Sequence, residues 1–203
     1  MQQSKSRLEA ISDAIFAFAA TLVVVSLDIP DNFADLRENL TGFFSFAVSF
    51  FAIMGIWWTH HNFFRRSDYV DLVVVGLNMA MVFVVLFYVY PLKFLANLAF
   101  GQGTIQDREE MLELFILYSF GFGAIFFFLS LMYFYVARKQ ARKELNFWGR
   151  HFSLFVAAAL LSILLAWLGI GIRYGLPGFV YMLLGPACGL HGWLSDVKED
   201  TQG

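Results

Sequence analysis

Six long apolar stretches, separated by short polar connections, fill most of the chain. They cover residues 12–27, 42–58, 72–92, 112–136, 152–172 and 178–194. A helix needs about 20 mostly apolar residues to cross a hydrocarbon core of about 30 Å. A membrane barrel would instead show shorter segments in which apolar and polar residues alternate. The pattern predicts an all-α, polytopic membrane protein with six transmembrane helices, and the short connections predict a single domain over residues 1–203.

The composition favours a membrane protein and excludes several other classes. Of the 203 residues, 59% are hydrophobic and 15% are charged, whereas about 25% of a soluble domain is charged. A soluble enzyme is therefore excluded. The net charge of −2 leaves no basic face for a nucleic acid. Cys188 is the single cysteine, so neither an internal disulfide nor a cysteine metal cluster is expected.

The distribution of lysine and arginine predicts how the helices are oriented. If the N-terminus is cytoplasmic, four of the 14 basic residues fall on the outer side and the others on the inner side. The four outer residues are Arg37, Lys93, Arg108 and Arg173. Because basic residues concentrate on the cytoplasmic side of membrane proteins, both termini are expected in the cytoplasm.

Polar residues within the apolar stretches are the first candidates for function, because placing them in a bilayer is costly. The first stretch has Arg7, Ser12 and Asp13 at its inner end. His60 lies near the end of the second stretch, and Asn78 lies at a matching depth in the third. We expect these five side chains to form a buried polar network that holds the helices together.

Alternatives to this network remain at three positions. Asp13 has a second interpretation as an interfacial carboxylate that headgroup water solvates. His61 is an alternative to His60 as the partner of Asp13. The two histidines also raise the question of a metal site, but adjacent helical positions point about 100° apart and no third ligand is close in sequence. We therefore expect no metal.

One face of the first stretch is a candidate pore lining. Residues at intervals of three and four form a stripe along a helix, and here they are Ala14, Phe18, Thr21, Leu22, Val25 and Ser26. If identical copies of this helix surround an axis, the stripe forms rings: bulky apolar rings close a pore by expelling water, and a hydroxyl ring partly replaces an ion's hydration. Alternatively, Thr21 simply donates a hydrogen bond to the carbonyl four residues earlier.

The run from Arg7 to Asp13 resembles a known signature. Arg7-Leu8-Glu9-Ala10-Ile11-Ser12-Asp13 is similar to the Arg-x-x-x-Phe-Ser-Asp motif of the transmembrane protein 175 family, with Ile11 in place of phenylalanine. The segments WWTHHNFFRR and LNMAMVF also resemble the family's second and third helices. The motifs cover the first 90 or so residues, and the helix count and loop pattern extend the resemblance to the rest.

The resemblance implies a potassium-selective channel whose pore is lined by the first helix, without a TVGYG filter. Bacterial members have one six-helix repeat and form homotetramers, so the implied protein is a homotetramer in the inner membrane of a bacterial cell. Its partners are other copies, the lipid bilayer and permeant potassium ions, with no cofactor. The family's constriction falls on Phe18 and its hydroxylic selectivity position on Thr21, with Leu22 and Val25 as alternative narrow rings.

Two other function classes are alternatives to a channel. A secondary transporter or a proton or cation leak pathway is the main alternative, but transporters usually show internal repeats and helices broken near the midplane. Here Pro91 and Pro186 lie near the ends of stretches. Ser12, Asp13 and a histidine resemble a catalytic triad on paper, yet the resemblance assigns them to helix packing. We expect no enzyme activity.

Overall fold

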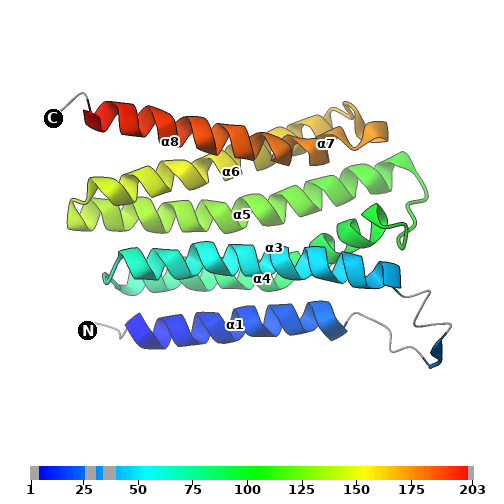
Figure 1. The fold of residues 1–203 in the computed structure, drawn as a ribbon, viewed down its shortest axis with the longest axis horizontal. Coiled ribbons are helices and arrows are strands. Elements are labelled where there is room, and N and C mark those ends of the chain that lie inside the picture. Colours follow the sequence, from blue (N-terminus) through cyan, green and yellow to red (C-terminus); the bar gives the residue numbers. More distant parts are fainter. Residues whose placement is uncertain (1–4, 26–30, 34–39, 201–203) are drawn as a thin grey trace. The chain divides into compact units, whose positions relative to one another are not determined.

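The computed structural model describes residues 5–25, 31–33 and 40–200, and these residues form helices and no strand. Five long helices come first: α1 (Lys5–Val25), α3 (Leu40–Arg66), α4 (Leu72–Ala99), α5 (Arg108–Gln140) and α6 (Lys143–Trp167), as Figure 1 shows. Shorter helical segments follow: η1 (Ile172–Tyr174), α7 (Leu176–Phe179), η2 (Val180–Leu183) and α8 (Leu184–Asp200). The predicted all-α fold is confirmed.

The five long helices of the described part are each long and apolar enough to cross a membrane. The sixth predicted span, residues 178–194, lies instead across α7, η2 and α8. Pro186 has no backbone N–H to donate to the carbonyl of Met182, which lies in the 3-10 segment η2. This segment is therefore helical but not one uninterrupted α-helix. The cytoplasmic placement of both termini stays a prediction.

The chain forms two compact units, Met1–Glu110 and Met111–Gly203. The first contains α1, α3 and α4, and the second contains nearly all of α5 together with the helices that follow it. The expectation of a single domain over residues 1–203 stays a prediction.

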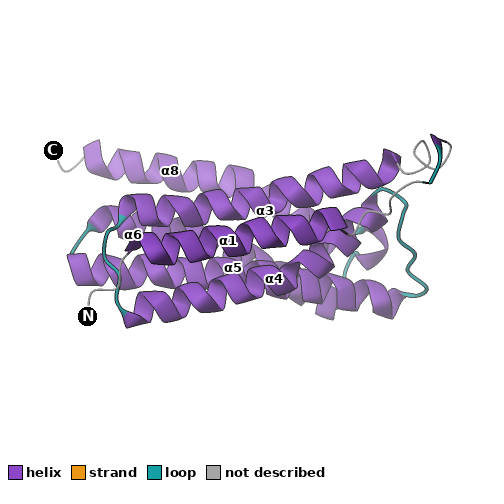
Figure 2. Ribbon diagram, turned by 90° about the horizontal axis from the view of Figure 1, so that it is seen from below, coloured by secondary structure: helices purple, strands orange, loops and turns teal. Residues whose placement is uncertain are grey.

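In the first unit, α1, α3 and α4 pack against one another (Figure 2). The buried side of α1 recurs every three or four residues, which is the period of one helix face. It consists of Leu8, Ser12, Phe16, Ala19, Ala20 and Val23. Side-chain contacts between α1 and α4 pair their early residues with each other and their late residues with each other, so the two helices run in the same direction. The late end of α3 lies beside the early part of α1.

In the second unit, two glycines let α5 and α6 approach closely. A Cβ atom on Gly149 would lie 2.7 Å from the ring of Phe134, and one on Gly123 would lie 2.9 Å from the Cβ of Ala159. α6 also contacts α7, η2 and α8. Close packing of small residues is a common means of helix association in membranes, where apolar side chains gain little by leaving lipid.

Candidate functional site

Three buried polar side chains join the helices of the first unit. The amide Nδ2 of Asn78 on α4 donates to Ser12 Oγ on α1 at 2.8 Å. The Oδ1 atom of the same amide lies 2.6 Å from His60 Nε2 on α3. None of the three side chains is more than 1% exposed. One amide thus connects both neighbouring helices, so the sequence brings Ser12, His60 and Asn78 together.

The hydrogen bonds of this trio fix the roles of its atoms. Because Ser12 Oγ accepts from Asn78, its own proton is free to go to the backbone carbonyl of Leu8, 2.8 Å away. Oδ1 of Asn78 is then an acceptor, so His60 donates from Nε2, and in a neutral ring Nδ1 carries the lone pair. That Nδ1 atom is buried, with no hydrogen-bond partner in the described part of the chain.

Asp13 and Arg7 lie outside this trio. Asp13 accepts a hydrogen bond from the indole Nε1 of Trp57 on α3 at 2.8 Å, at an exposed position. The Trp57 ring stacks on His61, with centroids 5.4 Å apart. Arg7 is exposed, and among the described residues no hydrogen bond joins it to Ser12, Asp13, His60 or Asn78. The sequence places Trp57 at the same depth as His60 and His61, and of these three candidates it is Trp57 that donates to Asp13.

The candidate pore residues lie on the exposed side of α1. Phe18 is 55% exposed and Val25 is 73% exposed, Thr21 is exposed and Leu22 is half-buried. At about 100° per residue, Phe18, Thr21 and Val25 point away from the face that packs on α3 and α4, whereas Leu22 lies at the edge of that face. Ser26, the last member of the predicted stripe, lies outside the described residues. The packing of the unit therefore leaves most of the stripe uncovered.

The hydroxyl of Thr21 donates to the backbone carbonyl of Ala17 at 2.9 Å. This is the local bond that the sequence offered as the alternative to an ion-facing role. The two are compatible, because a hydroxyl has one proton to donate and two lone pairs that accept or coordinate. With the proton held along the helix, the oxygen keeps its lone pairs on the exposed side.

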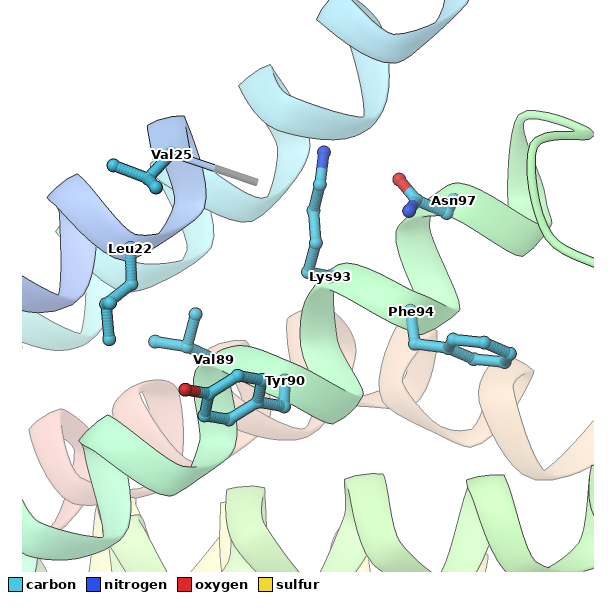
Figure 3. Close-up of a pocket in the computed structure, with 7 residues that line it drawn as sticks. All are labelled: Leu22, Val25, Val89, Tyr90, Lys93, Phe94 and Asn97. Carbon is cyan, nitrogen blue, oxygen red and sulfur yellow. The ribbon is translucent and has the colours of Figure 1, made fainter. Parts of the chain in front are cut away.

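A pocket of about 370 Å³ lies between α1 and α4 at the end where α1 finishes, and Figure 3 shows its side chains. Its lining residues are Leu22, Val25, Val89, Tyr90, Lys93, Phe94 and Asn97. The sequence predicts that the third span ends at Leu92 and counts Lys93 among the outer basic residues, whereas α4 continues through Pro91 to Ala99 and Lys93 is buried in it. Lys93 Nζ donates to Ser45 Oγ on α3 at 2.9 Å.

Serine pairs hold the helices of the second unit together. Ser119 Oγ on α5 and Ser162 Oγ on α6 are 2.8 Å apart, and Ser162 also donates to the carbonyl of Pro177 on α7. Ser130 Oγ on α5 donates to the carbonyl of Gly149 on α6. These bonds connect packed helices, and the hydroxyl of Tyr181 on η2 lies beside the Ser119–Ser162 pair. Within that part, no three histidine, cysteine, aspartate or glutamate side chains are arranged to hold a metal ion.

The sequence of this chain is similar to those of known proteins. The model of a family described as the endosomal/lysosomal potassium channel TMEM175 matches residues 7–88. A protein of Marivirga tractuosa named potassium channel is 34% identical over 161 residues, which are 71% of this chain and 64% of the relative. A potassium channel of Chamaesiphon minutus is 23% identical over 185 residues, 85% of this chain and 91% of the relative.

Two solved structures share the fold. One is the potassium channel MtTMEM175, as a threonine-to-alanine variant in complex with a nanobody–MBP fusion protein. It superposes with a TM-score of 0.76 and 30% identity, over 96% of this chain and 94% of that one. The other is a lysosomal potassium-selective channel TMEM175 homologue from Chamaesiphon minutus, with a TM-score of 0.63 and 21% identity over 89% of this chain and 97% of that one. At that identity, the second match supports the fold alone.

Proposed function

We propose that this chain, which belongs to the TMEM175 family, is a multi-pass membrane protein that conducts potassium ions passively. Family membership, expected from the run Arg7 to Asp13, is confirmed by the family model and by the solved relative at 30% identity. The five apolar helices of the described part support a place in the bilayer. Potassium conduction is proposed because the similar proteins are named potassium channels.

The observation that carries the proposed pore is the uncovered stripe on α1. An exposed apolar face on an otherwise packed helix calls for lipid or another subunit to cover it. In our proposal, four copies surround an axis and turn this face inward, so that Phe18 forms one ring and Thr21 the next. Leu22 and Val25 complete the path toward the end of α1. Ions then pass along a helix surface, and no chemical step is involved.

Selectivity in this pore would come from the cost of dehydration. A ring of phenylalanines at Phe18 excludes water, and an ion beside it loses hydration that the protein must replace. Thr21 oxygens offer part of that replacement, since their lone pairs stay on the exposed side. Potassium releases its water at lower cost than sodium, so this arrangement favours potassium modestly.

The buried trio has a positioning role in this proposal. A rotation of α1 about its axis would break the Ser12–Asn78 bond and remove the stripe from the pore axis. Because Asn78 also bonds to His60, the rotation of α1 is fixed against two helices at once. We propose that both termini are cytoplasmic and that the membrane is the inner membrane of a bacterium, as the distribution of basic residues and the bacterial relatives suggest.

Cysteine accessibility tests the assignment of the pore. In a Cys188→Ser background, Thr21→Cys is reconstituted in vesicles with opposed potassium and sodium gradients, and a water-soluble thiol reagent is added. Block of the potassium current is expected, since the side chain faces the path. Ala19→Cys is the matched control, because Ala19 lies two residues away on the buried face of α1. Equal block of the potassium current at both positions, or no block at either position, would refute a pore lined by this stripe.

A further inference from the structure

The side chain of Lys93 is a buried cation of the first unit, and the described residues around it satisfy only part of its hydrogen-bonding capacity and none of its charge. It is 7% exposed, and an ammonium group carries three donors. In the part of the chain that the structure describes, Nζ makes one hydrogen bond, to Ser45 Oγ at 2.9 Å, and no carboxylate lies within ion-pair distance. A charged side chain within a membrane helix is costly and is normally paired or functional.

The partner of Lys93 is neutral and already occupied. The Ser45 hydroxyl lies 2.7 Å from Asn97 Oδ1 and 2.9 Å from the carbonyl of Gly42, so its single proton goes to one of these acceptors. It accepts from Lys93 but supplies no negative charge. Two donors of the ammonium and its charge are therefore left for a group that the described residues of this unit do not provide.

The depth of Lys93 matches the edge of the hydrocarbon core. From Leu72, the first residue of α4, to Lys93 the helix rises about 32 Å at 1.5 Å per residue, and the hydrocarbon core of a bilayer is about 30 Å thick. With Leu72 at one edge of the core, Lys93 would lie at the level of the lipid headgroups at the other edge, at the end where α1 finishes. Val89 and Tyr90, which precede it on α4, lie deeper.

The pocket in Figure 3 has one polar end and one apolar side. Lys93 and Asn97 form its polar end, Leu22, Val25, Val89 and Phe94 are apolar, and the ring of Tyr90 adds a hydroxyl on the side of Val89. This combination fits an amphipathic anion, with its charge at the ammonium and its acyl chain on the apolar side. We propose that the pocket binds an anionic phospholipid, with its phosphate at Lys93 and Asn97 and its acyl chain along α1 and α4.

One consequence rests on the proposed function. Leu22 and Val25 belong both to this pocket and to the stripe proposed to line the pore. A lipid chain that packs on them would bias the rotation of α1, so conduction would depend on the anionic lipid content of the membrane. The binding itself is independent of conduction.

Lipid retention tests the binding directly. Protein extracted from vesicles of phosphatidylcholine with phosphatidylglycerol is examined by native mass spectrometry. Wild-type protein is expected to retain phosphatidylglycerol selectively. Lys93→Met, which keeps the side-chain length, should lower retention about tenfold or more, since a hydrogen bond to a charged group is worth at least that factor. Lys93→Arg should preserve retention, and Lys143→Met, at an exposed lysine in the second unit, is the matched control.

Three results would overturn the proposal. Equal retention in wild type and Lys93→Met would show that Lys93 does not recruit lipid. Displacement of phosphatidylglycerol by inorganic phosphate alone would show that the apolar side is not used and that the site takes a free anion. A change of subunit number in Lys93→Met, unaffected by lipid, would assign the counter-charge to a second copy of the chain. Asn97→Leu leaves the charge of Lys93 in place, so it should weaken the retention of phosphatidylglycerol less than Lys93→Met does. This second variant keeps the test valid if Lys93→Met misfolds.

Discussion

The bond between Ser12 and Asn78 offers the sharpest test of how the first unit is held together. The Asn78 amide makes two interhelical hydrogen bonds, at 2.8 Å to Ser12 and 2.6 Å to His60, and all three side chains are buried. Asn78→Leu removes both bonds at similar volume. Interhelical hydrogen bonds in membrane proteins average about 0.6 kcal/mol and reach about 1.7 kcal/mol. We expect a total loss of about 1–3 kcal/mol in the free energy of unfolding.

A double-mutant cycle isolates the energy of one bond. Unfolding of the reconstituted protein in mixed micelles is measured for Ser12→Ala, Asn78→Leu and the double variant. A coupling of about 0.5–1.5 kcal/mol is expected from the range measured for such bonds. Ser49→Ala is the control, because Ser49 is equally buried but donates to Ser45 within its own helix. It should show no coupling to Asn78, and zero coupling for Ser12 as well would refute the proposed role of the amide.

Three further predictions concern the pore and the packing of α5 on α6. Thr21→Val should lower the preference for potassium over sodium while conduction survives, and an unchanged reversal potential would count against a hydroxyl layer. Phe18→Ala should raise basal potassium flux into vesicles; unchanged flux would move the constriction elsewhere, with Leu22 the first candidate. Gly149→Ala should destabilise the second unit by about 1–3 kcal/mol, because the new Cβ atom would lie 2.7 Å from the ring of Phe134. Thermal unfolding in detergent measures the loss. An unchanged unfolding temperature would show that the ring moves aside freely.

The long helices and the buried trio follow from one physical rule. Apolar runs of spanning length must be helical in a bilayer, and polar residues inside them need partners. Ser12, His60 and Asn78 stand out by this rule, and the structure brings them together. The rule does not rank candidate partners, which is why the sequence alone could not choose between the two histidines and Trp57, whose indole N–H donates to Asp13.

Lys93 shows why helix ends are hard to place from sequence. A proline in an apolar run predicts the end of a helix, because proline lacks a backbone N–H and its ring crowds the preceding turn. Here the packing of α4 against α1 and α3 keeps the helix continuous through Pro91. Lys93 therefore lies inside a helix and beside a pocket, whereas the sequence alone ended the third span at Leu92 and counted Lys93 among the outer basic residues.

The bond from Thr21 to the carbonyl of Ala17 has a consequence for anions. Chloride requires a donated proton for solvation, whereas a potassium ion requires an electron pair. In a pore lined by this residue, the threonine protons already belong to the backbone, so a chloride ion would meet hydroxyl oxygens and no donor. The same layer that helps a cation through would thus reject an ion of the opposite sign, without any charged residue in the pore.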